Sequence, residues 1–317
     1  MTVLVVGAGA AGGYLGAQLI RAGREVRFLA HQHTCDRLNT QGLRIRRNAG
    51  VSAQPVRAVT AATLEGSFDV IVLAVRSDVV ESAINDIRGV VGADTRIVPL
   101  VNGVAHLSLL SAAFGEEVVL GGAARLATSM LADGTIDEVA PGIDLELGQL
   151  DGKTSALFDA VVQQFRVDDV TVRVRADMVE AMWEKFTFIT ATAVLTCLAG
   201  DVIGVVARTA GGPALGRRIA DEVSNVAAAE GYRPQRCCAR STRRRAHRSD
   251  RRLCAVDVPR FDRTSPRRGQ RAHRAGQPGA ASSHRHPHVG RRTRRHRRFY
   301  GSSVPVIATD RAGAVSH

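Results

Sequence analysis

Two features of this sequence could do chemistry: a glycine cluster near the first residues and a lysine in the middle of the chain. The cluster has the spacing Gly-x-Gly-x-x-Gly over residues 7–12, after the four apolar residues 3–6 and before a helical pattern that ends at Gly23. A strand, this spacing and a helix in succession form the context that a dinucleotide-binding fingerprint requires.

Each glycine of the cluster has a physical role in that fingerprint. Gly7 would form the tight turn, Gly9 would let a pyrophosphate approach the backbone, and Gly12 would let the helix pack closely on the strand. The free N–H groups and the positive dipole end of the helix favour phosphate. We therefore predict cofactor binding, rather than a merely structural turn, at these residues: Gly7, Ala8, Gly9, Ala10, Ala11 and Gly12.

The lysine is Lys185, one of only two in the chain. The other, Lys153, follows Asp151-Gly152 in an evident turn, so we expect it to be solvated. Lys185 stands just before residues 186–199, a stretch without charge, on a helix that the pattern predicts over 178–199. A buried amine is costly unless it is paired or functional. The alternative is that Lys185 reaches from the helix end to water, and composition alone leaves both readings open.

Apolar runs that alternate with helical patterns follow the glycine cluster. They predict strands at 25–30, 68–75, 96–101 and 117–120, hence βαβ units and a Rossmann-type parallel sheet. Ligands bind such sheets beyond the carboxyl ends of the strands. His31, Arg76 and Asn102 all follow strand ends, so we expect them to gather in space with the glycine turn.

The choice of cofactor rests on the end of the second strand. An NAD-binding unit has an acidic residue there for the ribose 2′-hydroxyl. This chain has His31 and His33 instead, which favours NADP (NADPH), although both histidines could simply be solvated.

The later elements complete the predicted architecture. A helix is expected from Asp36, with Gly42 as a break before a hairpin, and short antiparallel strands over 121–150. A helix over 152–165 and a strand at 170–174 would close the first domain, and helices at 178–199 and 208–231 begin an α-helical second domain. The apolar residues 186–199 are too few to cross a bilayer, so we expect no membrane partner.

The first residues and the cysteines of the chain indicate its cellular compartment. Met1-Thr2 leads straight into the first strand, so we expect no secretory signal. The five cysteines are an odd number without framework or zinc-site spacing, which fits a reducing cytoplasm and no metal. They are Cys35, Cys197, Cys237, Cys238 and Cys254.

The net charge of +13 is unevenly distributed. Residues 236–317 hold 22 Arg and 4 Asp with no Lys or Glu, a net charge of +18, which leaves −5 for residues 1–235. Residues 236–317 also contain few apolar residues, too few to fold a hydrophobic core. A nucleic-acid-binding tail is one reading. We favour an out-of-frame translation of a GC-rich gene, because abundant Arg without any Lys is unusual for a selected basic tail.

Four blocks of sequence, taken in order, resemble the ketopantoate reductase (2-dehydropantoate 2-reductase) family over residues 1–233. They are residues 7–14 (GAGAAGGY), 73–77 (LAVRS), 100–104 (LVNGV) and 183–186 (WEKF). The resemblance implies a Rossmann domain, a helical domain and an active site between them. It also implies NADPH-dependent reduction of ketopantoate to pantoate on the route to pantothenate and coenzyme A.

The resemblance further implies residue roles. Lys185 matches the catalytic lysine, and Asn102 would lie beside the nicotinamide ribose and the substrate. Arg76 stands where the family has a cofactor-binding lysine, and His31 where an arginine often contacts the 2′-phosphate. Ala127 would make a backbone contact to the cofactor.

The chain departs from the family at two places. Ile189 stands where an asparagine contacts substrate, so another 2-oxo acid remains open as substrate. The family pattern stops after Pro234. We therefore divide the chain into an NADP-binding domain (1–176), a truncated helical domain (177–234) and an Arg-rich tail (235–317).

The expected partner is a small 2-oxo acid. Nucleic acid would bind only through the tail, and we allow for a homodimer. A non-catalytic dinucleotide-binding protein is the alternative function.

Overall fold

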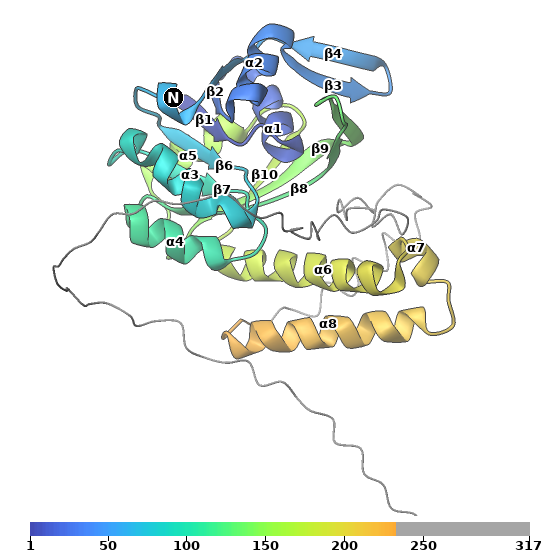
Figure 1. Cartoon of the computed structure of the whole chain (residues 1–317). Helices are drawn as coiled ribbons and strands as arrows, with labels where there is room; N and C mark the ends of the chain where they lie inside the picture. The colour runs from blue at the N-terminus through green and yellow to red at the C-terminus, as the bar shows by residue number, and fades with distance from the viewer. Residues whose placement is uncertain (233–317) are drawn as a thin grey trace, which may run out of the picture. The chain divides into compact units, whose positions relative to one another are not determined.

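Five parallel strands form the first sheet of the computed structural model, which describes residues 1–232 (Figure 1). Their order is β5-β2-β1-β6-β7. The strands are β1 (Thr2–Val6), β2 (Glu25–Leu29), β5 (Arg57–Val59), β6 (Val70–Leu73) and β7 (Arg96–Pro99). This is the Rossmann-type parallel sheet expected from the sequence, with the short strand β5 added at its edge.

The apolar run of β1 shows why this sheet is buried on both faces. Val3 and Val5 lie in the core cluster shared with helix α1 (Ala10–Arg21), whereas Leu4 and Val6 lie in the cluster on the opposite face. Successive side chains of a strand point to opposite faces, so a strand covered on both sides needs apolar residues throughout.

Helices cover this sheet. They are α1, α2 (Gln32–Gln41), α3 (Val80–Ile87) and α4 (Ala105–Phe114), with single 3-10 turns at Ala61–Thr63, Ser77–Val79 and Arg88–Val90. Helix α2 begins four residues before the expected Asp36, with His31 at its N-cap. It ends where predicted, because Gly42 takes a positive φ of 72°.

A second sheet contains β3 (Leu43–Arg47), β4 (Gly50–Gln54), β8 (Leu120–Met130), β9 (Ile136–Gln149) and β10 (Val170–Val174). Its order is β10-β9-β3-β4, and β8 pairs antiparallel with β9. The hairpin of β3 and β4 and the strand β10 lie where the sequence predicted them.

The expectation of short strands over 121–150 is wrong, because β8 and β9 have 11 and 14 residues. Gly134 turns the chain between the two strands with a φ of 77°, but Gly121 and Gly122 pack closely within β8: a Cβ at Gly122 would lie 2.7 Å from the Pro99 carbonyl oxygen. The strand expected at 117–120 is also displaced. Residues 116–118 form a turn, and only Val119 bridges to Ile97 before β8 begins.

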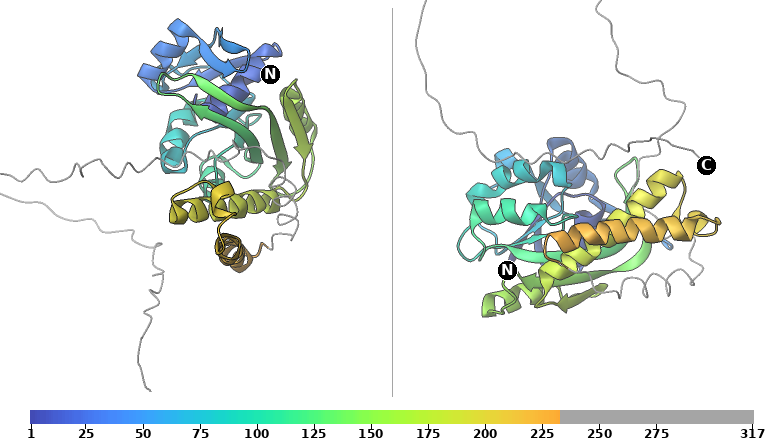
Figure 2. Two further views of the ribbon diagram at one scale, coloured as in Figure 1. Left: turned by 90° about the vertical axis from the view of Figure 1, so that its right-hand side faces the viewer. Right: turned by 90° about the horizontal axis from the view of Figure 1, so that it is seen from below.

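The chain continues through α5 (Ala156–Phe165) into the helices α6 (Met178–Ala199), α7 (Ile203–Val206) and α8 (Gly212–Ala229). Helix α6 has the predicted bounds, and α8 begins four residues later than expected. Helices α6 and α8 lie side by side, with α6 between α8 and the strands β8 and β9 (Figures 1 and 2). Trp183 of α6 stacks on Tyr232, which follows α8, at a ring separation of 5.5 Å.

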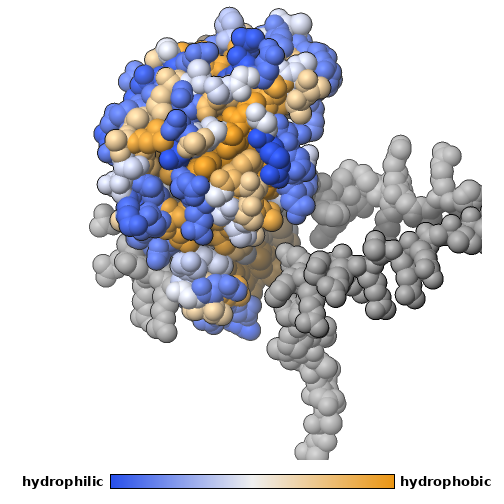
Figure 3. Space-filling view, turned by 90° about the vertical axis from the view of Figure 1, so that its left-hand side faces the viewer, coloured by the Kyte–Doolittle hydropathy of each residue, from blue (hydrophilic) through white to orange (hydrophobic). Residues whose placement is uncertain are grey.

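Hydrophilic and apolar side chains alternate over the face drawn in Figure 3. The helices α6 to α8 expose several apolar side chains, led by Leu198 at 70% exposure. Within residues 1–232, no helix is long and apolar enough to cross a membrane. The predictions for the Arg-rich tail (235–317) and for the end of the helical domain at 233–234 lie outside the described residues.

Candidate active site

The strand order places four predicted site segments along one edge of the parallel sheet. Strands β2, β1, β6 and β7 are neighbours in this order, and all run in the same direction. His31, Gly7, Arg76 and Asn102 follow the carboxyl ends of these strands. They therefore share the edge at which open α/β sheets bind ligands.

The glycine turn has the geometry that its spacing predicted. Gly7 has a φ of 96°, and a Cβ there would lie 2.5 Å from the carbonyl oxygen of Ala74 on the neighbouring segment. A Cβ at Gly12 would collide with the carbonyl oxygen of Gly7. At Gly9, the N-cap of α1, a Cβ would meet no atom within 4 Å. Gly7 and Gly12 thus serve the turn and the packing, and Gly9 leaves open space at the helix N-terminus.

The remaining cofactor candidates differ in their exposure. Ala8 is buried, and Ala10 and Ala11 are half-buried in the first turn of α1, which has no acidic side chain to repel phosphate. His31 is exposed at the N-cap of α2, where its carbonyl accepts hydrogen bonds from the N–H groups of Thr34 and Cys35.

Arg76 points into solvent with 82% of its side chain exposed, and its Nε donates to Asp78 Oδ1 at 3.0 Å. This ion pair raises the pKa of the Arg76 guanidinium. Ala127 is half-buried at a register irregularity of β8. The cofactor contacts assigned to both residues remain predictions.

Lys185 lies on the face of α6 that packs against β8. Met178, Ala181 and Met182 form a buried cluster with Ala123 of β8. Lys185 follows Met182 by three residues, which continues the same helix face. Its side chain is half-buried. Burial and the positive charge of Arg125 lower the pKa of Lys185 to about 8, against an opposing effect of Glu146. These observations favour a buried amine over one that reaches freely to water.

No pattern in the sequence indicated the charged pair beside Lys185. Arg125 of β8 donates from Nη1 to Oε2 of Glu146 on β9 at 2.7 Å, and Arg175 donates to the other carboxylate oxygen at 3.5 Å. Glu146 is only 5% exposed. It alternates with Leu145 and Leu147, a pattern that indicates a water-facing position, but α6 covers this face.

The loop after β7 connects the sheet edge with α6. A Cβ at Gly103 would lie 3.8 Å from Cε2 of Phe186, and Val104 and Leu107 pack against the buried cluster under α6. Asn102 is exposed just before this contact. Asn102 thus lies next to Gly103, whose position contacts Phe186, the residue that follows Lys185 on α6.

His106 of α4 is another residue that the sequence did not single out. It is 4% exposed, and its Nε2 has no hydrogen-bond partner among residues 1–232. Burial and the charge of Lys185 lower the pKa of His106 to about 4, so its imidazole is neutral near pH 7.

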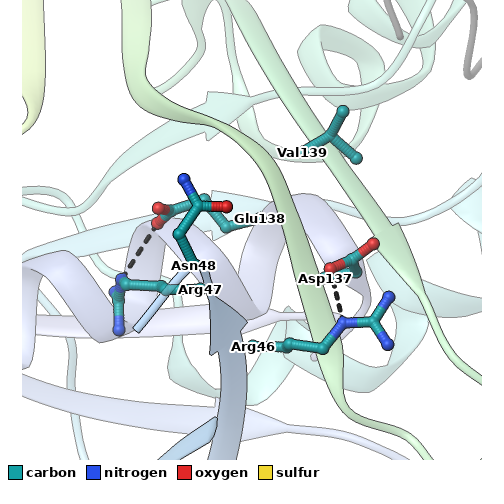
Figure 4. A pocket seen from close by; sticks show the side chains of 6 residues that line it. All are labelled: Arg46, Arg47, Asn48, Asp137, Glu138 and Val139. Atoms are coloured by element: carbon teal, nitrogen blue, oxygen red, sulfur yellow. Dashed lines mark hydrogen bonds and ion pairs between the residues drawn. The ribbon is translucent and has the colours of Figure 1, made fainter. Parts of the chain in front are cut away.

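A surface hollow between β3, the turn after it and β9 lies apart from these residues (Figure 4). It is lined by Arg46, Arg47, Asn48, Asp137, Glu138 and Val139. Both arginines are paired there, Arg46 with Asp137 at 2.8 Å and Arg47 with Glu138 at 3.1 Å. None of the predicted site residues lines it. In the described part of the chain, no group of three or more His, Cys, Asp or Glu side chains could hold a metal ion.

Comparison with known proteins gives two family matches. Residues 3–152 match the family model "Ketopantoate reductase PanE/ApbA", and residues 177–265 match "Ketopantoate reductase PanE/ApbA C terminal". The second match extends beyond Pro234, so the expectation that the family pattern stops there is wrong. The chain is 30% identical to the uncharacterized oxidoreductase YkpB of Bacillus subtilis over 232 residues, 73% of this chain and 76% of that protein.

Two solved structures share the fold. The chain resembles 2-dehydropantoate 2-reductase of Geobacter metallireducens with a TM-score of 0.66 and 26% identity, over 71% of this chain and 74% of the other. It also resembles D-mandelate dehydrogenase, solved with NADH and anilino(oxo)acetate, with a TM-score of 0.69 and 18% identity, over 74% and 76% of the two chains.

Proposed function

The chain belongs to the ketopantoate reductase family of oxidoreductases, and on this premise we propose that it reduces a 2-oxo acid to the 2-hydroxy acid with NADPH. The first candidate substrate is 2-dehydropantoate, which would place the protein in pantothenate and coenzyme A synthesis. One observation carries the proposal: the amine of Lys185 is partly buried, and its pKa is lowered to about 8. The helix α6 that bears it contacts the loop after β7, at the edge of the sheet where we propose that the cofactor binds.

The described residues fit a dinucleotide at that edge. The open space at Gly9 and the free N–H groups at the start of α1 suit a diphosphate. When bound, the reduced nicotinamide supplies the hydride. His31 would face the 2′-phosphate, and Arg76 could reach the cofactor after leaving Asp78. NADPH is our proposal over NADH, which accompanies the structurally similar D-mandelate dehydrogenase.

Lys185 would act on the carbonyl oxygen. Its ammonium would donate a hydrogen bond to the ketone, stabilise the negative charge that develops on oxygen, and then transfer a proton from Nζ. The hydride would arrive at the adjacent carbon, so the products are the 2-hydroxy acid and the oxidised nucleotide. Asn102 would orient the substrate and the nicotinamide ribose.

The test measures oxidation of NADPH by 2-dehydropantoate in the presence of the full chain. The reaction is monitored through the loss of absorbance of the reduced nicotinamide. Lys185→Met should lower kcat by about 10²- to 10⁴-fold, the usual contribution of a positioned proton donor. Lys153→Met is the matched control, because Lys153 is 80% exposed and paired with Asp151 on a turn.

Two outcomes would change the assignment. Turnover of other 2-oxo acids but not of 2-dehydropantoate would agree with the presence of Ile189 where the family has a substrate-binding asparagine. It would change the proposed substrate and leave the proposed reaction unchanged. Tight NADPH binding without turnover of any 2-oxo acid would favour the non-catalytic dinucleotide-binding alternative. The free thiols Cys35 and Cys197 suit the reducing cytoplasm that we propose as the setting.

A further inference from the structure

A second cation lies beside Lys185 on the strand that α6 covers. Gly121, Ala123 and Arg125 follow one another at two-residue spacing on β8, so their side-chain positions share one face. A Cβ at Gly121 would meet the side chain of Met178, and Ala123 packs in the same cluster as Met182. Arg125 therefore continues the strand face that contacts α6.

The facing side of α6 runs toward Lys185. Met178, Met182 and Lys185 occupy one stripe at helical spacing. The two series bring the amine of Lys185 near the guanidinium of Arg125. The lowered pKa of Lys185 agrees with this placement, because the Arg125 charge is its largest cause after burial.

Glu146 holds Arg125 in place without using all of its donors. The Nη1–Oε2 hydrogen bond is 2.7 Å long, and the Glu146 carboxylate also receives Arg175 at 3.5 Å. A guanidinium has five N–H donors in a fixed fork. The Nε and Nη2 groups of Arg125 have no hydrogen-bond partner among residues 1–232, and 35% of the side chain is exposed.

The charges at this place leave room for an anion. Arg125, Arg175 and Lys185 lie around the buried carboxylate of Glu146. The other two carboxylates nearby act on Arg175: Asp177 pairs with it at 2.6 Å, and Glu184 adds its charge. Like charges that lie close together repel each other, and a bound carboxylate would relieve that repulsion. The buried, unpartnered Nε2 of the nearby neutral His106 adds a further polar group with no partner in the described chain.

We propose that Arg125, fixed by Glu146, is the specificity-determining residue that binds the carboxylate of the 2-oxo acid. The carboxylate and the ketone occupy adjacent carbons of such a substrate. One cation on each group matches this chemistry: Arg125 on the carboxylate and Lys185 on the ketone oxygen. The inference rests on the function proposed above.

The test compares two substrates and two variants at about pH 6.5, where Lys185, with a pKa of about 8, is protonated. The substrates are 2-dehydropantoate and its lactone, which keeps the ketone but has no carboxylate. The variants are Arg125→Gln and Arg125→Lys. Arg173→Gln is the matched control, because Arg173 is a half-exposed arginine of the same sheet that pairs with Asp144 at 3.1 Å.

Arg125→Gln should raise the KM for the acid about 10- to 100-fold, as expected for one lost charge-assisted hydrogen-bond pair. It should change kcat much less and leave the KM for the lactone and the affinity for NADPH within about twofold of the unmodified chain. Arg125→Lys should recover part of the loss. Arg173→Gln should change neither substrate.

Three results would overturn the assignment. An equal loss for acid and lactone would mean that Arg125 only supports the fold or Lys185. A fall in NADPH affinity would place Arg125 on the cofactor. An unmodified chain that prefers the lactone would have no carboxylate site.

A binding measurement separates failure of this inference from failure of the proposed reaction. If the unmodified chain turns over neither substrate, calorimetry with oxamate and the NADPH-loaded chain still decides. Binding by the unmodified chain that is lost in Arg125→Gln supports the carboxylate site even without catalysis. Equal binding by both chains, or binding by neither, overturns it.

Discussion

Lys185 should titrate close to neutral pH, and the composition of the chain allows a direct measurement. The structure lowers its pKa from 10.5 to about 8. This corresponds to a cost of roughly 3 kcal/mol for the protonated amine. Because the chain contains only two lysines, labelling with ¹³C-lysine gives two side-chain signals to follow by NMR against pH. The substitution Lys153→Arg assigns them by removing one.

We expect the remaining signal to have its midpoint near pH 8. Arg125→Gln should raise the midpoint, because it removes a positive neighbour, and Glu146→Gln should lower it, because it removes a negative one. The rate of reduction should decline above about pH 8 with the loss of the protonated donor. A midpoint near the ordinary value of 10.5, or no response to Arg125→Gln, would refute the placement of the amine beside this guanidinium.

Three further predictions concern stability and binding. Between pH 8 and 10.5 the unfolded chain binds more protons at Lys185 than the folded chain, so the stability of the fold is lower below pH 8 than above pH 10.5. Lys185→Met removes the buried ammonium. Thermal unfolding at pH 7 should therefore show this variant to be more stable by about 1–3 kcal/mol. The pKa of His106 falls from 6.5 to about 4, so stability should drop as pH falls through this window, and His106→Leu should remove roughly 3 kcal/mol of that drop in acid denaturation. Gly12→Ala should unfold the chain at lower temperature because its Cβ meets the Gly7 carbonyl, whereas Gly9→Ala should leave Tm unchanged and weaken NADPH binding in a fluorescence titration.

The parallel sheet could be predicted from the sequence because its signals are local. A strand buried on both faces needs an uninterrupted apolar run, as Val3 to Val6 show, and a helical pattern follows each of these runs within a few residues. Helix α6 was equally clear, because its pattern begins after Asp177 and ends at Gly200, which takes the left-handed conformation that glycine favours.

The lengths of β8 and β9 were predicted wrongly because their glycines are required by contacts with segments distant in the sequence. Gly122 lies against the Pro99 carbonyl, and Gly148 lies against Arg175 and Met178. In sequence, the pair Gly121-Gly122 is typical of a turn. Only the packed structure shows that they permit close approach of other segments.

The charged neighbours of Lys185 were missed for a related reason. A carboxylate between two leucines on a strand indicates a surface position, unless another element covers that face. The burial of Glu146 depends on α6, more than 30 residues later, and on two arginines from β8 and the β10–α6 connection. Burial under α6 lowers the pKa of Lys185 most, and the charges of Arg125 and Glu146 adjust it further. Glu146 also orients Arg125. The chemistry of the lysine therefore depends on residues that no local pattern connects to it. A sequence that kept the glycine turn and Lys185 but lost Glu146 would keep the motifs of this family and lose the charge arrangement that we propose for its substrate.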